Sequence, residues 1–274
     1  MGGGAVASLA AQPRASGIRW ALLSDTHVAA DPNSEFRGFR PAENLKTVLS
    51  QVTGWKPDAL LIDGDLARSE GMPGDYARLK TMLEPVAGFP CGLTVGNHDH
   101  RGNFFEAFGK SGAGHSQPVK DKHVVVIEHG GLKMVLLDSL FIANEVAGLM
   151  GKAQRTWLDE YLQASGAAPV LLFVHHTLDD RDTSMLDADR FLRIAAKHRA
   201  VKAVFYGHSH HYGYDTVDGV HLVNLPAVGY NFVDGEPVGW VESRLTHDGA
   251  DLTLRAIGGN KNDDGKSRSL AWRS

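Results

Sequence analysis

Five short clusters of carboxylate, amide and imidazole side chains are spread along this sequence. They are Asp25 and His27 in Ser-Asp-Thr-His, Asp65 in Asp-Gly-Asp-Leu, Asn97 in Gly-Asn-His-Asp, His175 in Phe-Val-His-His, and His208 and His210 in Gly-His-Ser-His. Side chains of these types can hold two divalent ions about 3.5–4 Å apart, which is the geometry that clamps a phosphoryl group for in-line attack. Because each cluster follows an apolar run typical of a strand, the five together predict a two-metal site.

Two of the clusters carry their candidate ligands at alternate positions. In an extended segment, side chains two residues apart project to the same side. We therefore expect Asp25 and His27 to converge, and likewise His208 and His210. Gly207 precedes the second pair and allows a close backbone approach.

Two other clusters leave a choice of ligand. Asp65 follows Gly64, which lets the backbone turn sharply, and its two oxygens can bridge two cations. Asp63 is the alternative, and we expect it to brace the loop instead. His175 comes directly after an apolar run, so we prefer it as the ligand and leave His176 as a possible substrate contact.

The Gly-Asn-His-Asp cluster adds acid–base chemistry. Asn97 offers a neutral carbonyl oxygen, and Asp99 supplies a carboxylate able to orient an imidazole. A histidine held beside a metal-bound phosphate is a candidate general acid for the leaving oxygen. We therefore expect His98 and Asp99 to form a catalytic pair. Arg101 follows the cluster and could bind a phosphate oxygen as an alternative to lying on the surface.

Apolar runs alternate with segments of helical periodicity, which is typical of an α/β fold. The predicted strands are Ile18–Leu23, Ala59–Ile62, Gly92–Val95, His123–His129, Leu132–Leu137, Val170–Val174, Val201–Tyr206, Val220–Asn224, Gly239–Leu245 and Asp251–Ile257. The predicted helices are Ala42–Val52, Asp75–Val86, Asn103–Phe108, Ala153–Gln163 and Ala188–His198. The candidate ligands lie just past the carboxyl ends of strands, and in open α/β sheets that edge binds ligands.

Composition narrows the classes of function. The 274 residues are 43% hydrophobic and carry a net charge of −4. The acidic balance argues against an extended nucleic-acid surface and a nuclease. It is compatible with a small phosphate-ester substrate, because bound metals would be the largest local positive charges. No apolar stretch approaches the roughly 18 residues of a membrane span, and the sequence gives no indication of oligomeric state.

With these residues in view, the chain resembles the calcineurin-like metallophosphoesterase superfamily. The family pattern is Asp-x-His, Gly-Asp, Gly-Asn-His-Asp/Glu, His, then Gly-His-x-His, and every element is present in order between Ile18 and Ile257. Within the superfamily the chain is most similar to the bacterial branch of cyclic-nucleotide and glycerophosphodiester phosphodiesterases. One departure is Thr177, which stands where the family commonly has Pro. The resemblance implies a four-layer α/β sandwich of two mixed β-sheets flanked by helices, with two metals at the sheet edge.

The resemblance also implies a role for each candidate. It assigns Asp25, His27 and His210 to one metal, Asn97, His175 and His208 to the other, and Asp65 to a bridge between them. The implied reaction is in-line attack on a phosphodiester by a metal-bridging hydroxide, with His98 protonating the leaving oxygen and Asp99 orienting it. Two alternatives stay open, namely a phosphomonoesterase with the same site and a catalytically silent metal-binding scaffold.

Metal identity and substrate are less constrained by the sequence. Mixed imidazole and oxygen ligands suit Mn, Fe, Zn, Co or Ni. We expect substrate choice to depend on the loops Val28–Pro41, Phe141–Lys152 and Thr177–Leu186.

We divide the chain into a leader at 1–16, a metallophosphoesterase domain at 17–257 and a C-terminal extension on the surface at 258–274. Residues 1–11 have the small-residue character of an export signal without its charged start, which leaves cytoplasmic and exported locations open.

Overall fold

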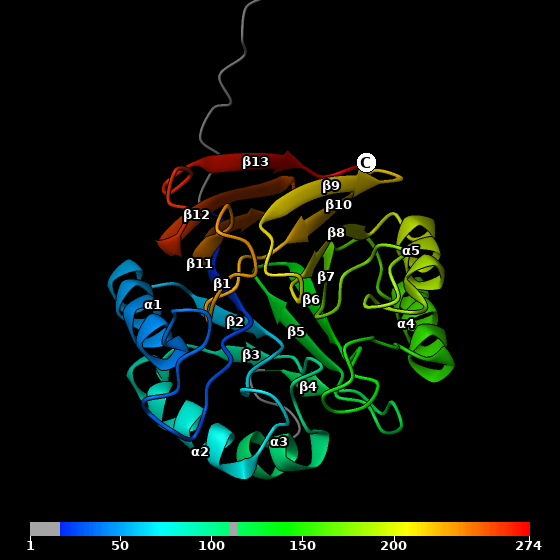
Figure 1. Cartoon of the computed structure of the whole chain (residues 1–274). Helices are drawn as coiled ribbons and strands as arrows, with labels where there is room; N and C mark the ends of the chain where they lie inside the picture. Colours follow the sequence, from blue (N-terminus) through cyan, green and yellow to red (C-terminus); the bar gives the residue numbers. More distant parts are fainter. Residues whose placement is uncertain (1–16, 110–113) are drawn as a thin grey trace, which may run out of the picture.

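The computed structural model describes residues 17–109 and 114–274, so the predicted leader at 1–16 lies outside the described residues. Two β-sheets pack face to face, and helices cover the outer face of each (Figure 1). The predicted α/β sandwich of two mixed sheets flanked by helices is confirmed.

The helices are α1 (Pro41–Trp55), α2 (Pro73–Met82), a 3₁₀ turn (Glu84–Val86), α3 (Arg101–Phe108), α4 (Lys152–Ala164) and α5 (Ala188–Lys197). The strands are β1 (Ile18–Ser24), β2 (Ala59–Asp63), β3 (Cys91–Leu93), β4 (His115–Ser116), β5 (Val125–His129), β6 (Leu132–Leu137), β7 (Val170–Val174), β8 (Val201–Tyr206), β9 (Gly213–Val217), β10 (Val220–Asn224), β11 (Pro237–Thr246), β12 (Gly249–Gly259) and β13 (Ser267–Ala271). Each predicted element is present, with boundaries shifted by a few residues.

Each sheet mixes parallel and antiparallel strands. The six-stranded sheet has the order β13-β12-β11-β1-β2-β3, and the seven-stranded sheet has the order β4-β5-β6-β7-β8-β10-β9. The pairs β1–β2 and β2–β3 are parallel in the first sheet, and β6–β7, β7–β8 and β8–β10 are parallel in the second. Parallel strands end at the same edge, so the loops that follow them meet there.

The alternation of side chains along β1 shows how the layers are held together. Trp20 and Leu22 belong to the apolar core between the two sheets, whereas Ala21 and Leu23 belong to the core beneath α1 and α2. All four are fully buried. Because successive residues of a strand point to opposite faces, a continuous apolar run is what a strand covered on both sides requires.

The C-terminal segment is part of the six-stranded sheet. Strand β13 lies within the predicted extension at 258–274 and pairs antiparallel with β12, and its Leu270 is buried in the inter-sheet core. The polar composition suits an edge strand, because most of its other side chains face solvent. No helix among the described residues has the length and apolar character needed to cross a membrane.

Candidate metal centre

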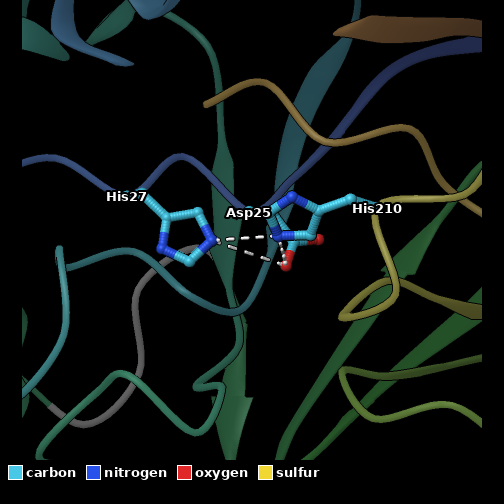
Figure 2. A group of neighbouring side chains, drawn as sticks. All are labelled: Asp25, His27 and His210. Carbon is cyan, nitrogen blue, oxygen red and sulfur yellow. Dashed lines mark hydrogen bonds and ion pairs between the residues drawn. The ribbon is translucent and has the colours of Figure 1, made fainter. Parts of the chain in front are cut away.

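Three ligand atoms from the loops after β1 and β8 converge on one point. Oδ1 of Asp25 lies 3.3 Å from Nε2 of His210 and 3.9 Å from Nε2 of His27 (Figure 2). The two Nε2 atoms lie 3.1 Å apart. All three side chains are buried, so this group could hold a metal ion.

Asp65, His175 and His208 form a second group beside the first. Nε2 of His175 lies 3.3 Å from Oδ2 of Asp65 and 3.8 Å from Oδ1 of Asp25. Oδ2 of Asp65 also lies 3.7 Å from Nε2 of His27. Asp65 is therefore situated between the two groups, where one carboxylate can contact two ions.

Asn97 and His98 complete the cluster. Oδ1 of Asn97 lies 2.9 Å from Nδ1 of His208, so the amide joins the second group. The ring of His98 lies 5.3 Å from the ring of His27, and its side chain groups with those of His27 and Asp65. The fold thus brings the seven predicted ligands and the predicted acid to one place.

Orphaned buried atoms show that these residues fit metal ions. Oδ1 of Asp25 and Nε2 of His175 are buried and have no hydrogen-bond partner among the described residues. Nδ1 of His175 donates to the carbonyl of Asp63 at 2.8 Å, and Nδ1 of His210 donates to the carbonyl of Tyr230 at 2.6 Å. These bonds turn each Nε2 atom toward the carboxylates, as in metal-binding histidines generally.

The electrostatics of the site also favour cations. Burial would raise the pKa of Asp25, but His175 and His210 hold it well below its usual range. Burial lowers the pKa of His27 to about 3 and that of His208 to about 4. At neutral pH both imidazoles are therefore uncharged and able to donate a lone pair to a metal.

The backbone at the site adopts an uncommon conformation. Five of the predicted ligands have φ in the left-handed region, at 53° for Asp25, 46° for His27, 45° for Asp65, 69° for His208 and 52° for His210. Such residues cost of order 1–3 kcal/mol each and gather at functional sites. Our expectation of extended segments is therefore wrong, since the side chains converge because the chain turns at each ligand.

Two glycines let the loops approach closely. A Cβ atom at Gly207 would collide with Oγ of Ser24 and Oδ2 of Asp25, and one at Gly96 would collide with the carboxylate of Asp65. Ser24 Oγ donates to Oδ2 of Asp25 at 2.5 Å, so the same crowding holds this ligand in position.

Asp99 does not orient His98, so the predicted pairing is wrong. Nδ1 of His98 donates to the carbonyl oxygen of Ser69 at 2.9 Å. The buried carboxylate of Asp99 accepts four other hydrogen bonds, from the N–H groups of Leu66, Ala67 and Gly96 and the hydroxyl of Tyr76. Asp99 therefore ties together the loops that follow β2 and β3.

The two alternatives to the predicted ligands are not members of the groups of converging ligand atoms. His176 is fully buried, and its Nδ1 lies 2.7 Å from the hydroxyl of Ser139, so it cannot be the substrate contact we considered. Asp63 braces its loop as expected, because Oδ1 accepts a hydrogen bond from Thr94 at 2.7 Å. Burial raises the pKa of Asp63 to about 7.

Arg101 is also engaged elsewhere. Its Nε donates to Oδ2 of the fully buried Asp138 at 2.6 Å, and one terminal nitrogen donates to Oδ1 at 2.8 Å. The same nitrogen contacts the carbonyl of Leu140. The guanidinium therefore neutralises a buried carboxylate and is not free to bind phosphate.

A cavity of about 280 Å³ opens onto the cluster. Its lining includes five predicted site residues and six others: Asp65, Asn97, His98, His208, His210, Val146, Thr177, Arg181, Thr183, Ser209 and Phe232. Val146 comes from the predicted loop Phe141–Lys152, and Thr177, Arg181 and Thr183 come from Thr177–Leu186. Phe232 was not among the predicted site residues, although two aromatic residues at 230 and 232, in the loop between the predicted strands Val220–Asn224 and Gly239–Leu245, were a usable signal.

The calcineurin-like phosphoesterase family model matches residues 18–212, which is most of the described chain. The chain belongs to this family. The calcineurin-like assignment from the motifs is therefore confirmed, and the protein is a metallophosphoesterase with buried Asp and His groups able to bind metal.

Among calcineurin-like relatives, a probable cyclic nucleotide phosphodiesterase of Synechococcus sp. is 29% identical over 237 residues, covering 84% of this chain and 88% of the relative. A second probable cyclic nucleotide phosphodiesterase, from Rhodococcus erythropolis, is 30% identical over 215 residues, covering 72% of this chain and 66% of the relative. The 3′,5′-cyclic adenosine monophosphate phosphodiesterase CpdA of Pseudomonas aeruginosa is 25% identical over 222 residues, covering 78% and 77%.

Solved structures share the calcineurin-like fold at lower identity. A dimetal phosphatase from Danio rerio superimposes with a TM-score of 0.73 at 15% identity, covering 94% of this chain and all of that one. GAP50 of Plasmodium superimposes with a TM-score of 0.61 at 14% identity, covering 95% and 90%. At these identities the likeness concerns the fold alone.

Proposed function

We propose that this protein hydrolyses the phosphodiester bond of a cyclic nucleotide at a two-metal centre. The observation that carries the proposal is the position of Asp65. Its Oδ2 lies 3.3 Å from Nε2 of His175, which belongs to one ligand group, and 3.7 Å from Nε2 of His27, which belongs to the other. The names of the relatives in Synechococcus, Rhodococcus and Pseudomonas support the choice of a cyclic nucleotide.

In this proposal the seven ligands divide between two ions of Mn, Fe, Zn, Co or Ni. Asp25, His27 and His210 would hold one, Asn97, His175 and His208 would hold the other, and Asp65 lies where it could serve both. Two ions so held would supply an activated water for in-line attack and neutralise charge on the phosphoryl oxygens.

The protein's own contribution to the proton transfer is His98. This side chain lines the cavity, and its Nδ1–H is committed to the Ser69 carbonyl. In the imidazolium form, Nε2–H is therefore the donor available to the departing oxygen. Ring opening of a cyclic phosphodiester needs such a proton, because the oxygen that leaves becomes a ribose hydroxyl.

The test uses metal-stripped protein reloaded with Mn, Zn or Fe. Turnover is measured on 3′,5′-cyclic adenosine monophosphate, bis(p-nitrophenyl) phosphate and p-nitrophenyl phosphate, with Asp65→Asn as the matched variant. Metal-dependent cleavage of the diesters over the monoester, lost in Asp65→Asn, is the expected result. Preference for the monoester would make the protein a phosphatase. No cleavage while two ions remain bound would favour the silent scaffold.

A further inference from the structure

The exposed apolar side chains are concentrated in three loops that also contribute residues to the cavity at the metal centre. Seven large hydrophobic residues are exposed in the described part of the chain, and six of them lie in the segments 141–146, 186 and 232–233. Two of the six, Val146 and Phe232, line the cavity at the cluster, with 48% and 45% of their surface exposed. Large apolar groups left in water at a cavity are typical of ligand-binding surfaces.

The ring of Phe232 packs on His210, one of the predicted metal ligands. The two rings are stacked, with centroids 4.2 Å apart and planes 24° apart. On the other edge of the imidazole, Nε2 of His210 faces Oδ1 of Asp25 at 3.3 Å. One side chain therefore separates the phenyl ring from the point where a phosphate would be held.

The backbone that carries Phe232 is fixed before any ligand arrives. Arg37 donates from Nε to the carbonyl of Asn231 at 3.1 Å and from a terminal nitrogen to the carbonyl of Phe232 at 2.8 Å. The side-chain amide of Asn231 donates to the carbonyl of Glu236 at 2.8 Å, which closes the same loop. Because the loop that carries Phe232 is already ordered, it loses little conformational entropy when a ligand binds.

We propose that Phe232 binds the nucleobase of the substrate and is the specificity-determining residue for nucleotides over smaller diesters. This inference rests on the proposed function. A nucleotide carries its base one sugar ring away from phosphorus, and an aromatic ring one side chain away from the ligand cluster suits that arrangement. Contacts between a base and an aromatic ring are tolerant of base identity, because every base has a π-face. Arg37 acts as a positioning residue that holds the loop.

The test compares two ligands that differ only in the base, adenosine 3′,5′-cyclic monophosphate and ribose 3,5-cyclic phosphate. Wild type, Phe232→Leu, Phe232→Tyr and the exposed neighbour Val233→Ala are each loaded with metal, and metal per chain is measured. Binding is followed by calorimetry with the slowly hydrolysed phosphorothioate analogue of each ligand, and KM and kcat are measured by product formation from the parent compounds.

We expect Phe232→Leu to weaken binding of the adenosine ligand roughly tenfold while leaving the ligand without a base unchanged. Phe232→Tyr restores the aromatic face and should restore affinity, and Val233→Ala should match wild type. Equal loss for both ligands, or wild-type affinity in Phe232→Leu, would overturn the inference. Binding of the adenosine ligand without its hydrolysis would instead sink the proposed function and leave the role of Phe232 standing.

Discussion

The carbonyl oxygen of Ser69 accepts a hydrogen bond from Nδ1 of His98 over 2.9 Å. Ser69 follows the Asp65 loop and His98 follows β3, so this bond crosses between two segments that carry ligands. The backbone N–H of His98 also donates to Oδ1 of Asp65 at 2.9 Å. Backbone and side chain of His98 are therefore both fixed relative to the central carboxylate, without help from Asp99.

Removing the imidazole of His98 should lower turnover without emptying the site. We expect His98→Ala to reduce kcat on a cyclic nucleotide by about 10²–10⁴-fold, the usual contribution of a positioned acid. Metal per chain should stay at the wild-type value, as measured by elemental analysis. His211→Ala is the control, because this exposed imidazole pairs with Glu236. Unchanged turnover in His98→Ala would remove the acid role.

Asp99→Asn should act mainly on stability. In the wild-type protein, three backbone N–H groups donate to the Asp99 carboxylate. An asparagine would turn at least one of its own N–H groups toward these donors, so the unfolding free energy should fall by about 2–4 kcal/mol. Urea unfolding would measure this change. Tyr76→Phe, which removes one of the four donors, should show a smaller loss. A wild-type stability for Asp99→Asn, with turnover as low as in His98→Ala, would restore the catalytic pair.

Arg101→Met should destabilise the protein and leave substrate affinity unchanged. Removing the guanidinium leaves Lys122, 3.5 Å away, as the remaining cation beside the fully buried Asp138, so the unfolding free energy should fall by about 1.5–3 kcal/mol, the usual value for a hydrogen bond to a charged group. Arg40→Met is the control, since that exposed guanidinium bonds only to Asn33 among the described residues and its loss should change stability by less than about 0.5 kcal/mol. A raised KM at wild-type stability would show that Arg101 binds phosphate after all.

Metal binding should release a proton from His175. Burial would lower the pKa of His175, but the carboxylates of Asp65 and Asp25 raise it to about 10, so the metal-stripped site holds a proton at neutral pH. A metal needs the neutral imidazole. Below pH 10 a rise in pH therefore strengthens binding, by up to about tenfold per pH unit for one displaced proton.

Calorimetric titration with Zn in buffers of different ionisation enthalpy would count the protons released on binding. His175→Gln should release about one proton fewer than wild type. Equal proton release by the two proteins would contradict the assignment of this proton to His175.

The convergence of the site was predictable because it follows from strand direction. Asp25, Asp65 and His175 each come one or two residues after the last residue of a buried parallel strand, and parallel strands bring such residues to one edge. The continuous apolar runs before them were sufficient to identify those strands.

Backbone conformation and partner choice were not predictable in the same way. His27 and His210 occupy left-handed conformations that only the surrounding loops enforce, and no local pattern specifies them. Asp99 lies next to His98 in sequence but finds its donors in the 66–67 loop and at Tyr76, which only the fold brings near. Strands β9 and β13 lack a clear apolar alternation, although each pairs with a strand next to it in sequence, β9 with β10 and β13 with β12.

The strand order of the six-stranded sheet has a consequence for how the protein is made. β1 pairs with β11, and the hydroxyl of Ser243 donates to the carbonyl of Trp20 across 223 residues of chain. The ribosome therefore releases β1 long before its antiparallel neighbour exists, and that apolar strand must wait with one edge open. The open edge of β1 therefore needs shielding by a chaperone during translation. The loop bearing Asp25 and His27 should reach its final conformation only after β11 has been synthesised.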